Sequence, residues 1–311
     1  MGFDLAALKA AVAAHGRVTR VVVAEVKGSA PREVGAAMLV WASGQSGTIG
    51  GGALEFEAAE AARYMEGSKR LTSHALGPDM GQCCGGSVTL LSEVYTAETL
   101  ATLEGEVIAR PVRPEPQPLA LTRLLNAARA QGQLPAPQMI AGWMVEPVAK
   151  PTQALWIWGA GHVGRALVDV LAPLPEFDIT WVDVLPSKFP DQIPAGVTAL
   201  PAREPERLVA HVASEAHHLI LTYSHQLDLA LCHRLLGHGF GFAGLIGSKT
   251  KWARFRSRLA ALGHGPEQIA RLTCPIGLPE LGKHPQAIAI GVAAELMALS
   301  QRADLKKEHS A

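Results

Sequence analysis

The chain is poor in cysteine and in aromatic residues, and it has no excess of either charge. Four cysteines in 311 residues, with Cys232 and Cys274 far apart, do not indicate a disulfide scaffold, so we expect a reducing, cytoplasmic environment. Lysine plus arginine equals aspartate plus glutamate at 28 each, so no net field would draw the chain to nucleic acid or anionic lipid. No apolar run approaches the roughly 20 residues that a membrane helix needs.

Two of the four cysteines are adjacent in the sequence. Cys83 and Cys84 are neighbours within the segment Gly81-Gln82-Cys83-Cys84-Gly85-Gly86. Glycines let a ligand approach the backbone and leave thiols uncovered, so the segment suits contact with a metal, a sulfur or a thiol partner. Free cysteine is also a small hydrophobe that is often buried, and the residues alone leave that structural reading open.

Residues 1–105 predict a small α+β domain with glycine-rich loops. Their N-terminus carries an acid early, at Asp4, and lacks the basic start of a signal peptide. Helical spacing and β-branched runs predict helices over 4–14 and 53–65 and strands over 18–27, 36–43 and 87–95. The glycine-rich loops lie at 28–36, 44–52 and 81–86.

The composition changes after this domain. Residues 106–150 contain proline-rich stretches that break helices and central strands, so we predict a linker with one helix near 119–130. Residues 151–300 alternate strand and helix patterns, which is typical of a parallel doubly wound sheet and makes the fold class α/β. Residues 301–311 are charged and predict a disordered tail.

A dinucleotide-type fingerprint opens the second half. The apolar strand 154–158 runs into Gly159-Ala160-Gly161-His162-Val163-Gly164, and a helix follows at once. In this pattern the first glycine permits a tight turn, the second lets a phosphate approach the backbone, and the third lets helix and strand pack. The next strand ends at Asp183, where an acid would accept from a ribose diol. We predict a Rossmann-type domain, whose turn suits NAD, another nucleotide or a pterin phosphate.

Two other strand ends carry polar residues. Gly247-Ser248-Lys249, between a strand and a helix, offers backbone N–H groups, a hydroxyl and an ammonium as a second anion nest. Tyr223 and His225 follow the strand that begins at residue 217, at the edge where parallel sheets bind ligands. His225 is as readily a plain residue at a helix start, and His162 most simply covers its turn.

Seven segments, in order and spread over nearly the whole chain, form a recognisable set. They are GSAPREVGAAMLV (28–40), GTIGGGALE (47–55), LGPDMGQCCGGSVTL (76–90), WGAGHVGRAL (158–167), LTYSHQLDL (221–229), GLIGSKTKWARF (244–255) and CPIGLPELGKHP (274–285). Together they closely resemble the XdhC/CoxI family, the accessory proteins of xanthine dehydrogenase and related molybdenum hydroxylases, and their spread makes the resemblance specific. The chain departs from the family's common residues at Glu280-Leu281 and at 286–289.

The resemblance implies a chaperone that binds molybdenum cofactor, holds it while a cysteine desulfurase replaces an oxo ligand by sulfur, and delivers it to apo xanthine dehydrogenase. Cys84 matches the family's Cys-Gly-Gly and is the expected molybdenum ligand, with Cys83 as second choice; thiolate is a suitable soft donor. The cofactor phosphate would lie at Gly159–Gly164 or at Gly247–Lys249. Arg32 and the glycines 50–52 would complete the pocket, although a structural salt bridge explains Arg32 equally well.

The expected partners are the molybdenum-binding subunit of xanthine dehydrogenase, a cysteine desulfurase and proteins of cofactor biosynthesis, and we expect a homodimer. An NAD(P)-dependent oxidoreductase is the alternative from another class, using the three glycines of the turn and Asp183. The sequence shows no coherent acid–base group for it beyond Tyr223 and His225. A scaffold that never holds the cofactor is a third reading; it predicts that Cys84→Ala leaves hydroxylase assembly intact.

Overall fold

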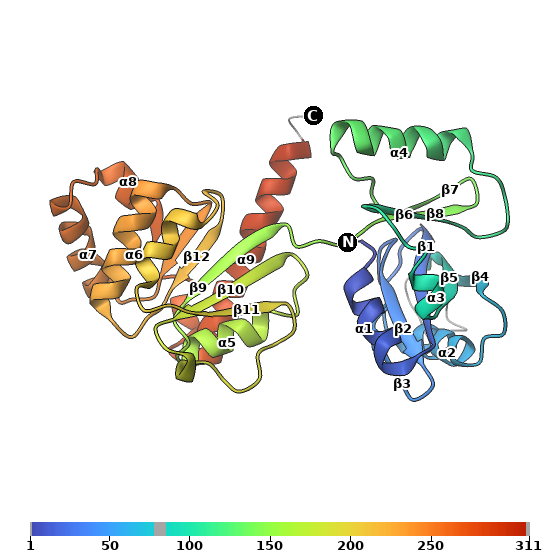
Figure 1. Ribbon diagram of the computed structural model, residues 1–311, viewed down its shortest axis with the longest axis horizontal. Helices are drawn as coiled ribbons and strands as arrows, with labels where there is room; N and C mark the ends of the chain where they lie inside the picture. The colour runs from blue at the N-terminus through green and yellow to red at the C-terminus, as the bar shows by residue number, and fades with distance from the viewer. Residues whose placement is uncertain (1, 78–84, 309–311) are drawn as a thin grey trace. The chain divides into compact units, whose positions relative to one another are not determined.

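The structure, a computed structural model, describes residues 2–77 and 85–308; for residues 301 and 303–308 only the helical backbone is described. The chain folds into two compact units, Met1–Lys150 (unit 1) and Pro151–Ala311 (unit 2), each with its own hydrophobic core (Figure 1). None of the described helices is both long enough and apolar enough to span a membrane.

Unit 1 is built on a five-stranded antiparallel sheet with the strand order β3-β2-β1-β5-β4. The central strand is β-branched and buried along its first seven residues, as a strand covered on both faces should be. The sequence did not predict the two edge strands: β3 lies inside the segment 44–52 that was predicted to be a loop, and the residues of β4 are mostly polar, as an exposed edge allows. The strands are β1 (Val18–Lys27), β2 (Ala37–Trp41), β3 (Gly44–Gly47), β4 (Lys69–Ala75) and β5 (Ser87–Tyr95).

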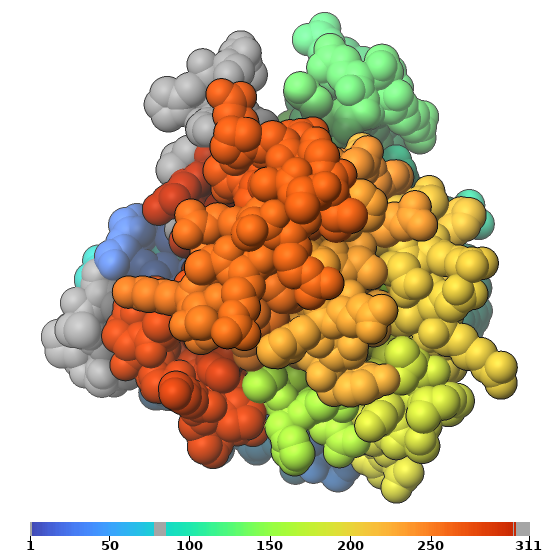
Figure 2. All heavy atoms as spheres, turned by 90° about the vertical axis from the view of Figure 1, so that its left-hand side faces the viewer, coloured from blue at the N-terminus to red at the C-terminus, as the bar shows by residue number. Residues whose placement is uncertain are grey.

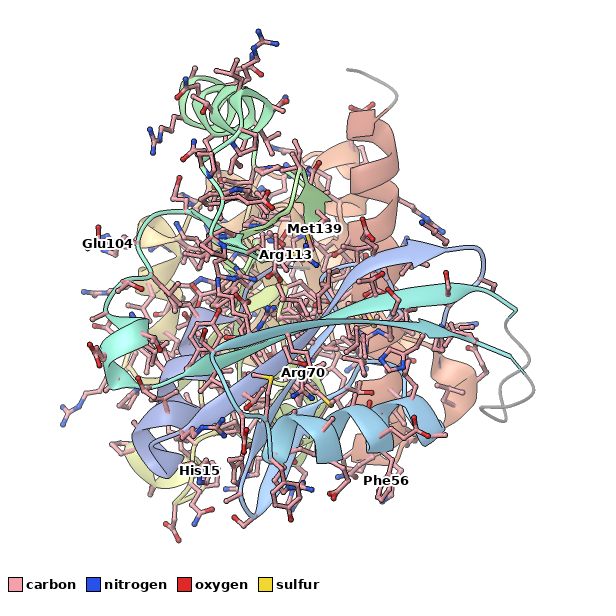
Figure 3. The ribbon with its side chains drawn as sticks, turned by 90° about the vertical axis from the view of Figure 1, so that its right-hand side faces the viewer. His15, Phe56, Arg70, Glu104, Arg113 and Met139 are labelled. Atoms are coloured by element: carbon pink, nitrogen blue, oxygen red, sulfur yellow. The ribbon has the colours of Figure 1, made fainter. Side chains whose placement is uncertain are left out.

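The two faces of this sheet carry different layers. Val21 and Val23 of β1 share a core with helix α2 (Gly52–Arg63), which lies along one face in Figure 3. Val22 and Ala24 point to the other face and pack against Met144. This alternation is the period of two that strands impose. Two further helices, α1 (Leu5–His15) and α3 (Ala97–Leu100), add their apolar residues to a third cluster in this unit.

The region predicted to be a linker is instead part of unit 1. Residues 106–150 form a three-stranded antiparallel sheet of order β6-β8-β7 and a helix. Their prolines stand where a missing N–H is tolerated, at strand ends and beside the helix start, so a proline-rich composition did not prevent a sheet. The elements are β6 (Val107–Pro111), α4 (Leu119–Gln131), β7 (Gln138–Ile140) and β8 (Trp143–Pro147).

A buried ion network joins the small sheet to the main one. The Arg20 guanidinium on β1 donates to both carboxylate oxygens of Glu146 on β8, at 2.7 and 3.0 Å. Arg110 on β6 donates to Glu146 and, through Nε at 2.7 Å, to Glu93 on β5. Burial raises the pKa of Glu146, but the two arginines lower it further, and the net pKa lies below its usual range. All four side chains are buried.

Unit 2 has the predicted α/β architecture. Its six strands are all parallel and follow the order β11-β10-β9-β12-β13-β14, which confirms the Rossmann-type fold predicted from the sequence. The order reverses between β9 and β12, and in such sheets ligands bind at the carboxyl ends of the strands at this switch point. The strands are β9 (Gln153–Trp158), β10 (Phe177–Asp183), β11 (Val197–Pro201), β12 (His217–Ile220), β13 (Phe242–Leu245) and β14 (Leu272–Thr273).

Helices cover both faces of this sheet. Leu155 and Ile157 of β9 share a core with α5 (His162–Leu171) and α9 (Pro285–Glu308), while Trp158 shares one with α6, α7 and α8. Helix α9 continues to Glu308, where the sequence predicted a disordered tail from residue 301: charged residues are good helix formers and extend a helix already begun. The remaining elements are α6 (His225–His238), α7 (Lys249–Ala261), α8 (Pro266–Ala270) and the 3-10 helices η2 (Pro186–Lys188), η3 (Pro205–His211) and η4 (Pro279–Leu281).

Candidate functional site

The glycine turn of unit 2 joins β9 to α5, and its three glycines have different surroundings. Gly159 has a φ of +121°, and a Cβ there would lie 2.5 Å from the Leu221 carbonyl oxygen. A Cβ on Gly164 would lie 2.0 Å from the Gly159 carbonyl oxygen. Gly161 has no atom within 4 Å of its Cβ position. The outer glycines are therefore required by packing, and the middle one leaves open space where a phosphate could approach the backbone.

Asp183 and Trp181 hold this turn in place. Asp183 is buried at the end of β10, and its carboxylate accepts from the backbone N–H of Ala160 at 2.6 Å and of Val184 at 2.7 Å. The Trp181 indole N–H donates to the Gly159 carbonyl oxygen at 3.0 Å. The sequence predicted Asp183 as an acceptor for a ribose. In the structure each of its oxygens accepts from a backbone N–H, so Asp183 positions the turn, and its role toward a ribose stays a prediction.

The rim of the turn is basic. The N–H groups of the first turn of α5 have no helical acceptor, and His162 and Arg165 are exposed there. Arg165 donates to the carbonyl oxygens of Ala160 and Lys188, and the Lys188 ammonium lies 5.6 Å from the centre of the Tyr223 ring. Beside the turn, Trp158, Gly159, Asp183 and Thr222 line a cleft of only about 10 Å³, room for one water molecule. The rim therefore favours binding of an anion, while the cleft is too small to admit the ring of a nucleotide or pterin.

The second predicted nest differs from its prediction at the lysine. Ser248 caps α7 by accepting from the backbone N–H of Lys251 at 3.2 Å, and Lys249 is exposed. Lys251 turns back to the strand ends: its ammonium donates to Asp228 at 2.6 Å and to the Ile246 carbonyl oxygen at 2.8 Å. The sequence did not predict this ion pair, in which Asp228 is fully buried and Lys251 partly so. Its partners come from α6 and α7, and no local pattern links two residues that far apart.

Two thiols lie near this ion pair without being reactive. A Cβ on Gly247 would lie 3.3 Å from the Cys274 sulfur, so that thiol stands at the strand ends beside Lys251. Burial raises the pKa of Cys274 to about 11, with Lys251 lowering it and Asp228 raising it. Cys232 is fully buried, and its pKa is also raised by burial. Both thiols therefore stay protonated near neutral pH and are poor metal ligands.

Tyr223 and His225 are exposed at the start of α6. His225 is the first helical residue, and its ring lies 6.5 Å from the Phe255 ring. This is the plain helix-start position that the sequence analysis set beside a functional one. Within the part of the chain that the structure describes, no three His, Cys, Asp or Glu side chains gather as a metal site.

In unit 1, two of the glycine-rich loops meet. Ser29 pairs with Gly85, and a Cβ on Gly86 would lie 2.2 Å from the Ser29 carbonyl oxygen. Leu76 and the pair Gly85–Gly86 exchange backbone hydrogen bonds at 2.8 and 2.9 Å, which closes the ends of the loop between β4 and β5. Cys83 and Cys84, the predicted soft ligands, lie outside the described residues. The described ends of their loop stand against the first glycine-rich loop.

The remaining glycine-rich loop joins the same cluster through Glu55. This carboxylate, in the first turn of α2, accepts from the Thr48 hydroxyl and from the N–H groups of Ile49 and Gly51 at 2.9 and 3.0 Å. Burial raises the pKa of Glu55, but these hydrogen bonds outweigh it and leave the pKa below its usual value. Arg32 reaches the Thr48 carbonyl oxygen at 3.5 Å. The sequence analysis named Arg32 and missed Glu55, although an acid just after Gly50-Gly51-Gly52 is a helix-start signal.

Comparison with protein families gives two matches. A model described as the XdhC and CoxI family matches residues 11–74, and one described as the XdhC Rossmann domain matches residues 155–296. The first match lies in unit 1 and contains the loops around Arg32 and Glu55. The second lies in unit 2 and contains the glycine turn and the Lys251 region.

Two relatives from Escherichia coli K12 were found. PaoD, a molybdenum cofactor insertion chaperone, is 24% identical over 303 residues, which cover 93% of this chain and 85% of PaoD. YqeB is 31% identical over 146 residues, which cover 47% of this chain and 27% of YqeB. The chain thus spans about a quarter of YqeB and most of PaoD.

A solved structure with a similar fold covers nearly the whole chain. It is a protein of Bacillus halodurans, described as a xanthine dehydrogenase, and it matches with a TM-score of 0.69 and 20% sequence identity over 96% of both chains. At this identity the likeness concerns the fold.

Proposed function

Because the chain belongs to the XdhC and CoxI family, we propose that it binds molybdenum cofactor as cargo and passes it to an apo-hydroxylase. The observation that carries the proposal is the alignment with a molybdenum cofactor insertion chaperone over most of both chains. Membership of the family alone would leave the cargo unnamed. Such a cargo requires an anion site and soft donors; unit 2 carries a turn suited to an anion, and the sequence of unit 1 carries a loop with two cysteines.

The chemistry of the cargo supports this assignment. Molybdenum cofactor carries a terminal phosphate at one end and a metal bound by a dithiolene at the other. The Gly159–Gly164 turn offers the phosphate free N–H groups, a helix N-terminus and the basic side chains Arg165 and Lys188. Because Asp183 and Trp181 fix the turn before a ligand arrives, little ordering would oppose binding.

The metal end of the cargo would use the loop that carries Cys83 and Cys84. Cys232 and Cys274 are poor candidates because burial raises the pKa of each. Cys84 remains our first choice of ligand, with Cys83 second. The glycines that flank this loop, held by Ser29 and neighbours, would let the metal approach closely.

An NAD(P)-dependent oxidoreductase fits the site less well. Both oxygens of Asp183 are engaged by backbone N–H groups, and the cleft beside them has a volume of about 10 Å³. Neither Tyr223 nor His225 has a partner that would make it an acid or a base, among the contacts of the described residues. A nucleotide bound by the turn alone stays a second candidate ligand.

We further propose that sulfuration by a cysteine desulfurase takes place while the cofactor is held, and that the client is xanthine dehydrogenase. Proteins of cofactor biosynthesis would supply the cargo, and the carrier would act as a cytoplasmic homodimer. These partners follow from the family resemblance and from the name of the relative. The carrier itself would catalyse no turnover reaction.

A handover experiment tests this proposal. The chain, preloaded with sulfurated cofactor under anaerobic conditions, is mixed with apo xanthine dehydrogenase, and hydroxylase activity is followed against an equal amount of free cofactor. We expect the preloaded chain to restore activity faster, and Cys84→Ala to lose this advantage. Cys83→Ala tests the second choice of ligand, and Cys274→Ala, which removes a thiol that burial keeps protonated, is the control. Equal activation by free cofactor and by the preloaded wild type would contradict the carrier role, and full activity of Cys84→Ala would favour the scaffold reading.

A further inference from the structure

A second cleft in unit 2 lies away from the glycine turn and is rich in basic side chains. It has a volume of about 630 Å³, well within the range of small-molecule sites. Its walls are η3, the second half of α6 and the turn between α7 and α8. Figure 2 looks onto this end of unit 2, where the yellow of η3 adjoins the light orange of α6. The lining residues are Glu206, Arg207, Val209, Ala210, His233, Arg234, Gly237, His238 and His264.

A hydrogen bond joins two imidazoles in this cleft. His233 Nδ1 and His264 Nε2 lie 2.7 Å apart, a hydrogen-bond distance, so one nitrogen donates and the other accepts. Burial and the neighbouring His233 hold the pKa of His264 below its usual value. When both rings are protonated, two N–H groups and two positive charges face each other. A negative ligand would relieve that repulsion.

Among the other charged groups of the cleft, one guanidinium lacks a carboxylate partner. Arg207 pairs with Glu204 at 2.9 Å, whereas Arg234, exposed on α6 next to His233, has no carboxylate partner among the described residues. Glu206 is the one carboxylate among the lining residues, and together with Glu204 it balances the two guanidiniums. His238 donates to the Val212 carbonyl oxygen at 2.7 Å. Arg234 and the two hydrogen-bonded imidazoles are therefore the groups that could meet an anion.

We propose that this cleft binds a phosphate-bearing small molecule, held by Arg234 and by the His233–His264 pair. Guanidinium and imidazolium groups form charge-assisted hydrogen bonds to phosphate oxygens, and the open side of Gly237 leaves room for the rest of the ligand. Val209 and Ala210 give the cleft an apolar wall. The site is independent of the proposed cargo, because none of its lining residues belongs to the glycine turn.

Binding should be coupled to the charge on the His233–His264 pair. A nearby negative charge favours the charged form of an imidazole, so bound phosphate should raise the pKa of His264, which burial and His233 otherwise hold below its usual value. Because phosphate itself also takes up a proton near neutral pH, the titration of the rings measures this coupling more directly than the pH dependence of affinity.

The test uses the full-length chain, inorganic phosphate as probe, and NMR of the histidine rings assigned by His233→Asn and His264→Asn. We expect phosphate to shift both rings in a saturable way and to raise their pKa values, with sodium chloride at equal ionic strength as reference. Arg234→Gln should weaken binding about tenfold, because it removes one charge-assisted hydrogen bond. Arg254→Gln, exposed on α7 outside the cleft, is the matched control.

Gly161→Ala separates this site from the glycine turn, since it adds a side chain to the turn and leaves the cleft unchanged. Its histidine response to phosphate should equal that of the wild type. The proposal is overturned if chloride shifts the rings as much as phosphate does. It is also overturned if Arg234→Gln binds phosphate as tightly as Arg254→Gln.

Discussion

At the scale of single residues, the glycines of the turn have different roles: some are required for packing, and one is free to contact a ligand. Gly164 is buried against the Gly159 carbonyl oxygen, whereas Gly161 starts α5 with open space around it. The sequence pattern predicted all three glycines together. It could not tell which of them touches protein and which faces a ligand, because that depends on the Leu221 segment and on the angle of the helix.

Replacement of Gly164 by alanine should destabilise unit 2. Its Cβ would lie 2.0 Å from a backbone oxygen, so helix and strand must separate, at a cost of about 3 kcal/mol in unfolding free energy. Gly161→Ala should cost about 1 kcal/mol or less, since it only replaces a helix N-cap glycine. Denaturant titration of both variants measures the difference. Equal unfolding free energies for the two would show that the third glycine is not required by packing.

The Lys251–Asp228 pair shows what residue patterns do not reveal. Lys249 matched the expected nest by position, yet Lys251 is the lysine whose ammonium reaches the strand ends. The difference arises because Lys251, the third residue of α7, turns back over Gly247. Similarly, Glu55 organises the 47–52 loop through contacts that only the folded loop brings within reach.

At the scale of elements, the small sheet depends on buried charge. Glu146→Gln would leave Arg20 and Arg110 without their shared carboxylate, and we expect a loss of about 3 to 5 kcal/mol in the stability of unit 1. Glu106→Gln is the matched control, because the Glu106–Lys150 pair joins the ends of the same region but is exposed, and it should change nothing measurable. Thermal unfolding of the two variants decides: a Glu146→Gln chain as stable as Glu106→Gln would contradict the role given to the network.

Strand β12 should make unit 2 sensitive to acid. Burial lowers the pKa of His217 to about 4 and that of His218 to about 3, the latter also through neighbouring histidines. Unfolded histidines titrate near 6.5, so as the pH falls the unfolded chain takes up these protons first. Stability is therefore complete above about pH 6.5 and is lost as the pH falls towards 4, by on the order of 2 kcal/mol or more.

His218→Gln tests this sensitivity, since glutamine can still accept from the Trp158 indole N–H, which lies 3.2 Å from His218 Nδ1. Its unfolding free energy should depend less on pH between about 6.5 and 4 than that of the wild type. His211→Gln, at an exposed position in η3, should keep the wild-type slope. Parallel slopes for all three chains would contradict the assignment to β12.

At the scale of the whole molecule, the fold of unit 2 could be predicted from its sequence more completely than the fold of unit 1. Unit 2 was predictable because strand, glycine turn and helix follow each other locally, and the six-stranded parallel sheet agrees with that pattern. The 106–150 region was not, because its partners lie far away in sequence: Arg20 and Glu146 are 126 residues apart. Buried arginine and glutamate also resemble surface residues in a linear sequence, and prolines at strand ends resemble a linker.

Each unit should fold without the other, because each hydrophobic cluster draws its residues from one unit. We expect a fragment of residues 1–150 to unfold cooperatively. A fragment of residues 1–105 should not fold, since it buries Arg20 and Glu93 without Arg110 and Glu146. Circular dichroism during thermal unfolding of both fragments measures this. A cooperative transition in the shorter one would restore the linker interpretation.

The central claim, that this chain carries molybdenum cofactor, is tested most directly by retention. Cofactor released under anaerobic conditions is mixed with purified chain, free cofactor is removed by gel filtration, and bound molybdenum and pterin are quantified, with an NAD titration in parallel. We predict retention by the wild type and by Gly265→Ala, another helix N-cap glycine with room for a Cβ, and loss of retention in Gly161→Ala and Cys84→Ala. No retention by the wild type together with tight NAD binding would contradict the account.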